Sequence, residues 1–425
     1  MEVVSMAENS SHYAIEPPID TRLNGAIRAF GGIEDAMMIV HGRSCCHADN
    51  FLYRVMTAGH NKIRLTGGGL RLRDISTGGH HKLSLSLSAT YEQFKPSLIA
   101  ILSTSVPLMM GDDVEGVILK LTEKIPVPII SLPCPGHSKN ASLGYDMALS
   151  SLCDYMEVDG HRNQRSINLI GLKSDNPYAL SDLMELKRML KDQRIVVNAI
   201  FTCDTFESLK KAPDAELNVV LGGEGIGLAK KMEEMFDIPY KVVSYPFGLR
   251  GSVEFFESIA SALGIELDHR SIETERERLK EKLERVYGFL EGIYNLKTAI
   301  VGESGRAFDL ARFLNDELCL DVKLLGVTSA NAETARRRRN GDYFEHFLKV
   351  EDRLHLNEVA GPMNIELMIG SSLEAVFCKE NNVPLTKLFY PTIDQVFISD
   401  YPIAGFRGVG NLTELVLNTG MDLNR

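Results

Sequence analysis

The chain has 425 residues, of which 44% are hydrophobic and 24% charged, and its formal net charge is −11. This composition is that of a globular protein long enough for several α/β domains. The acidic balance excludes a general affinity for nucleic acid or for anionic membranes, since both require a basic surface. The chain has no apolar run of about 18 residues and no signal-peptide pattern, so we expect a cytoplasmic protein.

Short, continuous apolar runs alternate with helical patterns along most of the chain. Such runs are typical of parallel strands buried on both faces. The predicted strands are Ala36–Val40, Leu98–Leu102, Val127–Ser131, Ile167–Ile170, Val196–Ile200, Leu217–Leu221, Lys241–Val243, Thr298–Val301, Val322–Val327, Ile365–Ile369 and Leu385–Leu388. The predicted helices include Leu180–Lys191, Leu228–Phe236, Val253–Leu263, Phe308–Leu318 and Leu373–Asn381. This rhythm predicts an α/β fold built from doubly wound, Rossmann-like parallel sheets.

Three other segments help to divide the chain. The glycine-rich stretch Thr66–Gly69 predicts a loop, and the charged pattern over His269–Leu296 predicts one long connecting helix. The basic run Arg336–Arg339 and the poorly periodic region after it predict a solvated face, with the docking of an acidic partner as the alternative. The resulting boundaries place three domains at 1–165, 166–296 and 297–425.

The sharpest local motif is the segment His41–His47, which contains Cys45 and Cys46 and directly follows a predicted strand. Sites in α/β proteins lie in loops at the carboxyl ends of strands. Two thiols beside an imidazole suit a soft metal, and Arg43 favours the thiolate form. The alternative is a pair of ordinary buried thiols, which is the expectation for most of the other cysteines.

A second motif places Gly222, Gly223, Gly225 and Gly227 between a predicted strand and a predicted helix. Backbone amides in such a loop are able to hold an anion. The spacing differs from the dinucleotide-binding fingerprint, and there is no Walker A sequence, so this chain is not expected to hydrolyse ATP. The alternative is a tight strand-to-helix turn without a ligand.

Several segments, taken in order, resemble the nitrogenase component-1 family. They are Gly25–Ile33, Ile39–Gly42 with Cys46, Leu72–Gly79, Thr104–Val117, Val127–Gly136, Ile167–Gly171, Ala215–Val220, Ile238–Tyr240, Pro246–Gly248 and Tyr401–Gly408. The resemblance spans nearly the whole chain. It implies three doubly wound domains, the first of which carries a loop for an iron–sulfur cluster of the [4Fe-4S] type.

The departures from the family pattern bear on function. Fuller members bind an interfacial cluster with three cysteines per subunit, whereas here Cys46 takes the middle position and Cys45 is a neighbour or alternate ligand. Pro17-Pro18 and Val106 stand near the other two positions. The missing ligands are therefore expected from a second chain, either a homologous subunit or an identical copy, in a dimer or heterotetramer.

The large metal cofactor of true nitrogenase has no evident ligands here, since its cysteine and histidine would fall near Gly222 and Tyr390. No permanently bound iron–molybdenum cofactor is therefore expected. The glycines are instead expected to leave a cavity between the domains, walled by Gly222–Gly227 and Tyr390–Asp394. A tetrapyrrole or a metal cluster is a candidate substrate there, with Arg250 and His41 as candidate polar contacts.

The resemblance implies a subunit of a nitrogenase-like oxidoreductase. Electrons would come from a separate ATP-hydrolysing iron protein, pass through the cluster at Cys46 and reduce a substrate held between the domains. One alternative is a scaffold subunit that holds a maturing nitrogenase-type metal cofactor without turnover. Another is a metal-free ligand-binding module on the same sheets.

Overall fold

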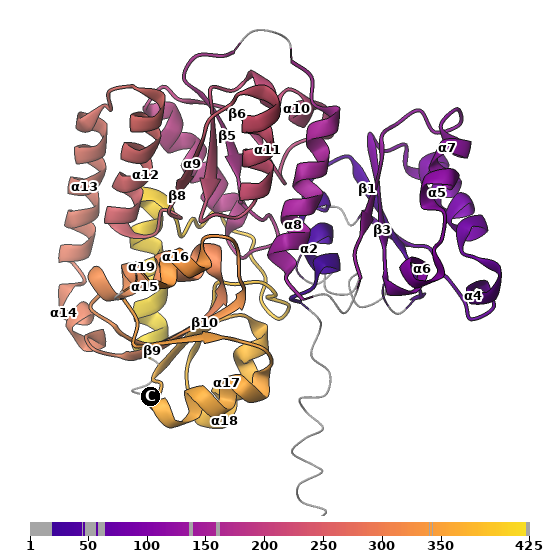
Figure 1. Cartoon of the computed structure of the whole chain (residues 1–425). Helices are drawn as coiled ribbons and strands as arrows, with labels where there is room; N and C mark the ends of the chain where they lie inside the picture. Colours follow the sequence, from indigo (N-terminus) through magenta and orange to yellow (C-terminus); the bar gives the residue numbers. More distant parts are fainter. Residues whose placement is uncertain are drawn as a thin grey trace, which may run out of the picture.

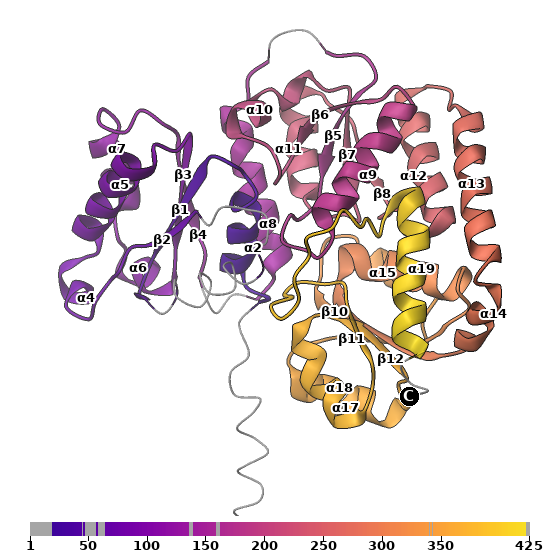
Figure 2. The same ribbon diagram turned by 180° about the vertical axis from the view of Figure 1, so that it is seen from behind.

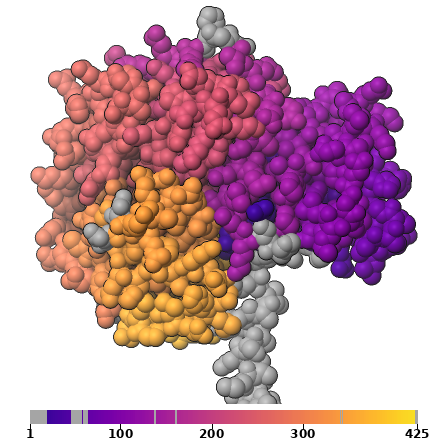
Figure 3. Space-filling view, viewed as in Figure 1, coloured from indigo at the N-terminus to yellow at the C-terminus, as the bar shows by residue number. Residues whose placement is uncertain are grey.

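The computed structural model describes residues 19–44, 46, 57, 64–135, 139–158, 162–339, 341 and 343–421. Within these ranges three parallel sheets follow one another along the chain. The first sheet stands to one side, and the other two lie closer together (Figure 1 and Figure 2). The first domain therefore protrudes from the surface of the molecule (Figure 3). The predicted α/β fold of parallel sheets is confirmed.

The first sheet has the strand order β2-β1-β3-β4. Its strands are β1 (Ala36–His41), β2 (Leu65–Gly67), β3 (Leu98–Ser103) and β4 (Ile129–Pro133). Its helices are α2 (Arg22–Phe30), α4 (Asp74–Thr77), α5 (His80–Phe94), α6 (Ser105–Met110), α7 (Val114–Leu121) and α8 (Ala141–Ser150). Buried residues of α2 and α8 pack on one face of the sheet, and those of α5 and α7 pack on the other.

The edge strand β2 corrects the first half of the loop predicted at Thr66–Gly69, since Thr66 and Gly67 belong to the strand and Gly68 and Gly69 do not. The amide of Met38 donates to the carbonyl of Arg64 at 2.8 Å, and the amide of Gly68 donates to the carbonyl of Val40 at 2.8 Å. An edge strand is held by backbone hydrogen bonds on one side only, so a polar or glycine-containing segment is able to form it.

The second sheet has the order β6-β5-β7-β8 and is likewise parallel. Its strands are β5 (Ser166–Ile170), β6 (Val196–Ile200), β7 (Leu217–Leu221) and β8 (Tyr240–Val243). Its helices are α9 (Ala179–Asp192), α10 (Phe206–Lys210), α11 (Ile226–Phe236) and α12 (Gly248–Leu263).

The long helix predicted over His269–Leu296 is interrupted. Helix α13 (His269–Glu284) ends early and is followed by α14 (Tyr287–Leu290) and one 3-10 turn. Val286 leaves the helical conformation, with φ −114° and ψ 11°. Gly288 and Gly292 follow it, and glycine disfavours a helix interior, so the charge pattern alone overestimated the length.

The third sheet has the order β11-β10-β9-β12-β13. Its strands are β9 (Lys297–Glu303), β10 (Asp321–Ser329), β11 (His346–Lys349), β12 (Leu367–Gly370) and β13 (Leu385–Lys387). Its helices are α15 (Ser304–Asp316), α16 (Thr334–Arg339), α17 (Arg353–Ala360), α18 (Ala375–Asn381) and α19 (Gly405–Met421). Strand β11 lies in the region predicted to be irregular, and the basic run forms α16.

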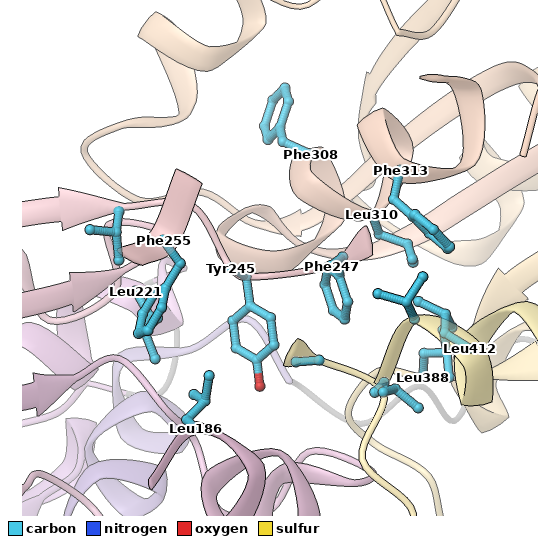
Figure 4. Packing of buried hydrophobic residues seen from close by; sticks show 14 of the residues in the cluster. Leu186, Leu221, Tyr245, Phe247, Phe255, Phe308, Leu310, Phe313, Leu388 and Leu412 are labelled. Atoms are coloured by element: carbon cyan, nitrogen blue, oxygen red, sulfur yellow. The ribbon is translucent and has the colours of Figure 1, made fainter. Parts of the chain in front are cut away.

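The second and third domains share one hydrophobic core. Leu221 and Phe255 of the second domain, Leu310 and Phe313 of the third, and Leu412 of α19 belong to the same buried cluster (Figure 4). Helix α19 ends the chain but packs against α9, α12 and α13 of the second domain. None of the described helices is long and apolar enough to cross a membrane.

Candidate functional site

The loop after β1 carries Cys46. Gly42 opens this loop, and an added Cβ there would lie 2.2 Å from Oγ1 of Thr104, so only glycine fits. The amide of Cys46 donates to the carbonyl of Arg43 at 3.1 Å. The Cys46 side chain is half-buried and packs against the core of the first domain, whereas Cys45 lies outside the described residues. The predicted ligand Cys46 therefore stands at the rim of the sheet.

His41 lies on the opposite face of the same sheet. Its Nε2 is 3.0 Å from Oδ2 of Asp112, whose other oxygen accepts from the amide of Gly79 at 2.9 Å. Burial lowers the pKa of His41 and outweighs the hydrogen bond to Asp112, so the neutral imidazole donates its Nε2–H to the carboxylate. The pair joins the loop after β1 to the loop between α6 and α7, and it does not face the second and third domains as predicted.

Three other cysteines differ from Cys46 in being fully buried. Cys134, which follows β4 in the same sheet, is buried, as are Cys153 and Cys378. Burial raises the pKa of each of these thiols to about 12, so they stay protonated. Cys203 is half-buried and Cys319 is exposed, so the burial expected for most of the cysteines is found for three of these five.

The donor set around Cys46 fits a metal cluster only if the cluster is shared with another chain. Among the described residues, no three His, Cys, Asp or Glu side chains are grouped as metal ligands. Val106 in α6, at one position where the family has a cysteine, offers no donor atom, and Pro17-Pro18 lie outside the described residues. A four-iron cluster needs four ligands, so the rest would have to come from elsewhere.

The glycine loop between β7 and α11 is closely packed. A Cβ on Gly222 would lie 2.0 Å from the carbonyl oxygen of Gly305, and one on Gly225 would lie 2.5 Å from Cγ2 of Ile170. Side chains also fill the space beside Gly223, which faces Glu333, and Gly227, which faces Asp146. On the side of an added Cβ these four glycines face packed atoms and not open space, since they allow α15 and its neighbours to approach. A ligand at this loop stays a prediction.

Five buried charged residues occupy the point where the domains meet. We call this group the ionic junction, and its members are Arg28 of α2, Lys173 and Asp175 after β5, Glu224 after β7 and Glu303 at the end of β9. Each of the three domains contributes at least one member. The carboxyl ends of strands in the second and third sheets therefore converge, as predicted, but they converge on charges.

The contacts of the ionic junction are short and specific. Arg28 binds Asp175 through two nitrogens at 2.7 and 2.9 Å, and its third nitrogen contacts Glu303. Lys173 Nζ lies 2.9 Å from Oε2 of Glu224 and 3.2 Å from Oε1 of Glu303. Arg28 is thus the residue through which α2 is tied to both other domains.

Electrostatics keeps the ionic junction charged despite its burial. Burial alone would raise the pKa of Glu303, but the nearby Arg28 and Lys173 overcome this effect and lower it to about 2. Burial would also lower the pKa of Lys173, yet Glu224 and Glu303 raise it. At the edge of the junction, burial and then the charge of Glu224 raise the pKa of Asp146 to about 7.

The remaining predicted contacts divide between the junction and the surface. Tyr390 is buried, with its ring 4.0 Å from the guanidinium of Arg28, and its hydroxyl lies 3.3 Å from Oδ1 of Asn24. Asp394 lies near the surface, where it pairs with Lys387 at 2.7 Å. Arg250 is exposed on α12 and pairs with acids of α12 and α15. Of these three, only Tyr390 joins the ionic junction.

A cavity of about 660 Å³ adjoins the ionic junction on the side of Asp175. It lies between the loop that leads into α9 and the segment Thr392–Asp400. Tyr178 and Phe397 meet edge to face beside it, with ring centroids 4.8 Å apart. Among the described residues that line it, none is Cys, His, Lys or Arg, so these residues offer neither thiolate or imidazole ligands nor cations.

A patch of exposed apolar side chains lies near the carboxyl end of the first sheet. It is formed by Leu72 and Ile75 in and before α4, and by Leu108 and Met109 of α6. Helices α4 and α6 are in contact, so these side chains come from neighbouring elements. We call it the α4–α6 patch. Clustered exposed apolar side chains are typical of interaction surfaces.

Sequence reasoning missed the members of the ionic junction. Three of the five had a visible signal, because each is a charged residue within an apolar or glycine-rich stretch: Arg28 between Ile27 and Ala29, Glu224 inside the glycine run, and Glu303 at the end of an apolar strand. Charged residues in such positions are buried only when paired. Their partners were not predictable, since they come from other domains. Lys173 and Asp175 lie in a polar stretch and had no such signal.

Comparisons with known proteins agree on one family. The sequence model described as "Nitrogenase component 1 type Oxidoreductase" matches residues 21–421. The chain is 25% identical to the nitrogenase vanadium-iron protein beta chain of Trichormus variabilis, over 98% of this chain and 96% of that one. It is 30% identical to the nitrogenase iron-molybdenum cofactor biosynthesis protein NifE of Clostridium pasteurianum, over 57% of this chain and 53% of that one.

Two further similarities complete the comparison. The chain is 22% identical to one subunit of the light-independent protochlorophyllide reductase of Cereibacter sphaeroides, over 90% of this chain and 73% of that one. Among solved structures, "Nitrogenase Cp1 at pH 6.5" superposes with a TM-score of 0.82 at 19% identity, over 96% of this chain and 93% of that one. At this identity the structural match bears on the fold alone.

Proposed function

The chain belongs to the nitrogenase component 1 type oxidoreductases, and on that premise we propose that it is a subunit of a nitrogenase-like oxidoreductase complex. In this proposal the complex accepts electrons from an ATP-hydrolysing iron protein through a [4Fe-4S] cluster, and Cys46 is the ligand from this chain. The observation that carries the proposal is the half-buried Cys46 in the loop after β1, at the carboxyl end of a buried parallel strand. Cys45 remains the candidate alternate ligand.

The shortage of ligands supports a second chain in the complex. One thiolate from this chain leaves three positions of a four-iron cluster to be filled. A homologous component 1 subunit or an identical copy is the partner that we propose, with the cluster at the interface beside Cys46.

The α4–α6 patch is the proposed docking surface for the iron protein. Met109 at 86% and Leu72 at 72% exposed are apolar side chains that a partner would cover. The patch shares the first domain with Cys46, and α6 and the Cys46 loop follow neighbouring strands of one sheet. A donor docked there would lie at the same end of the sheet as the cluster.

Iron content of the anaerobically purified complex tests the proposal. Cys46→Ala is expected to lose most of the bound iron, because the thiolate is this chain's proposed ligand. Cys134→Ala is the matched control, since Cys134 also follows a strand of the first sheet but stays a buried thiol. Full iron content in Cys46→Ala would contradict the proposal, and a colourless wild-type complex would favour the metal-free binding module.

A scaffold for assembly of a nitrogenase-type metal cofactor is the second candidate function. The 30% identity to NifE over 253 residues favours it. Measuring multiple turnovers distinguishes the reductase from the scaffold. A reductase is expected to consume electrons and ATP continuously when its iron protein and substrate are supplied, whereas a scaffold is expected to stop after its cluster has been reduced or transferred.

A further inference from the structure

We infer that the meeting point of the three domains is permanently closed in this chain by the ionic junction, so that any large cofactor or substrate of the complex is bound on a partner chain. The inference rests on the proposed function, because it assigns the ligand site within that complex. It replaces the expectation of a ligand cavity between the glycine loop and Tyr390.

The first argument is that the space is filled. The resemblance places the cysteine and histidine ligands of the large nitrogenase cofactor near Gly222 and Tyr390. In this chain the carbonyl of Gly222 accepts from Nδ2 of Asn331 at 3.0 Å, and the ring of Tyr390 covers Arg28 at 4.0 Å. The side chains of the ionic junction are 2–6% exposed. Neither position carries a soft ligand, and the side chains around both are already packed.

The second argument concerns charge. The ionic junction contains two cations and three carboxylates, and neutral donors complete it: Ser142 and Asn331 donate to Glu224 at 3.2 and 2.9 Å, and Asn176 donates to Glu303 at 3.4 Å. An iron–sulfur cluster or a tetrapyrrole carboxylate entering here would meet Glu224 and Glu303. Displacing Arg28 to admit it would separate Asp175 from Arg28 and leave Glu303 with Lys173 as its remaining cation, which is strongly unfavourable in a buried site.

The third argument is that opening the junction would separate the domains. Arg28 contacts Asp175 of the second domain and Glu303 of the third, so it joins the first domain to both. Lys173 contacts Glu303 and joins the second domain to the third. A domain movement that made room for a ligand would break several of these contacts together.

The adjoining cavity does not offer a substitute site for such ligands. Iron–sulfur clusters need thiolate or imidazole ligands, and tetrapyrrole carboxylates need cations. The described residues that line the cavity provide neither, and Asp175 at its inner end is already paired with Arg28.

Hydrogen–deuterium exchange tests the closed state in the complete complex, isolated without air and compared before and after reconstitution with ferrous iron and sulfide. We expect the segments 172–176, 222–227 and 302–306 to exchange as slowly as the amides of β5 and β7, with no change on reconstitution. A change in exchange there, or in segment 392–400, would place the added cluster at the junction or in the adjoining cavity, rather than beside Cys46 alone, and would overturn the inference.

Two variants separate this inference from the proposed function. Arg28→Met is expected to lower the thermal midpoint while keeping the bound iron, and Cys46→Ala is expected to lose the iron with little change in midpoint. Loss of iron in Arg28→Met with full iron in Cys46→Ala would overturn the inference. If Arg28→Met does not fold, Asn331→Ala, which removes the hydrogen bonds to Gly222 and Glu224, takes its place. If the wild-type complex contains no iron, the proposed function is contradicted, whatever the outcome for the junction.

Discussion

The carboxyl end of the first sheet and the ionic junction occupy equivalent positions in their domains, but their chemistry is opposite. At the first, the half-buried Cys46 and the α4–α6 patch remain accessible to other molecules. At the second, the loops after β5, β7 and β9 turn charged side chains onto one another and exclude water. The comparison indicates that strand ends in this fold serve equally well for recruiting partners and for fixing domains.

The two regions also differ in what sets their geometry. The pair of His41 and Asp112 organises the first region within a single domain, with one hydrogen bond at 3.0 Å. The ionic junction requires three domains at once, and removing one member of a buried ion pair is strongly destabilising because it leaves a buried charge uncompensated. The following predictions test this contrast, from the largest expected effect to the smallest.

Arg28→Met is expected to lower the free energy of unfolding more than any other substitution considered below. The substitution leaves Asp175 and Glu303 buried without their shared cation, and breaking one partner of a buried ion pair costs roughly 3–5 kcal/mol. Urea unfolding measures the change in the free energy of unfolding. The control Arg250→Ala removes exposed ion pairs on α12 and is expected to leave this energy nearly unchanged. Equal effects of the two variants would show that the junction has no special role.

Asp146→Asn is expected to change how stability depends on pH. The folded pKa of Asp146 is about 7, raised from 3.8, so the folded state binds its proton more tightly than the unfolded state does. The resulting stabilisation is present below pH 4 and is lost as the pH rises to about 7. The variant lacks this loss, so at pH 8 it is expected to be more stable than wild type by roughly 2–4 kcal/mol. Unfolding measured across this range checks the result, and parallel pH profiles would refute it.

Asp112→Ala is expected to loosen the first region. It leaves the His41 imidazole and the Gly79 amide without an acceptor, at a cost of about 1–3 kcal/mol. Because the loop after β1 is then less constrained, the Cys46 thiol is expected to react faster with a maleimide. Asp113→Ala, which removes the N-cap of α7, is the control: it is expected to cost about 1 kcal/mol without changing the labelling rate. Unchanged labelling in Asp112→Ala would mean that the pair does not position the loop.

Met109→Asp is expected to have the smallest effect on folding. Met109 is 86% exposed, so the free energy of unfolding is expected to change by no more than about 0.5 kcal/mol. Binding of the iron protein is expected to weaken by about tenfold or more, because a charge enters the apolar α4–α6 patch. Leu119→Asp, at a residue of α7 that is 78% exposed and outside the patch, is the control. Equal affinities for both variants would place the docking surface elsewhere.

Much of the fold was predictable because buried parallel strands leave continuous apolar runs, as at Leu98–Leu102 and Val322–Val327. The edge strands β2 and β11 were not, since backbone hydrogen bonds hold them and their side chains carry little signal. At the site, the position of Cys46 after β1 followed from one local motif. The close packing at Gly222 could not be predicted from a local motif, because it depends on Gly305, 83 residues further along the chain. Local patterns predict elements, whereas a filled space depends on residues that only the tertiary structure brings together.

The position of α19 has a consequence for the synthesis of the protein. Residues Phe406, Val409, Leu412, Val416 and Leu417 of this last helix belong to the core that the second domain shares with the third. In addition, Asp182 of α9 accepts hydrogen bonds from the amides of Ile403 and Ala404. During translation the second domain lacks this cover until residues 403–417 have been made, so its apolar face stays exposed to chaperones up to that point.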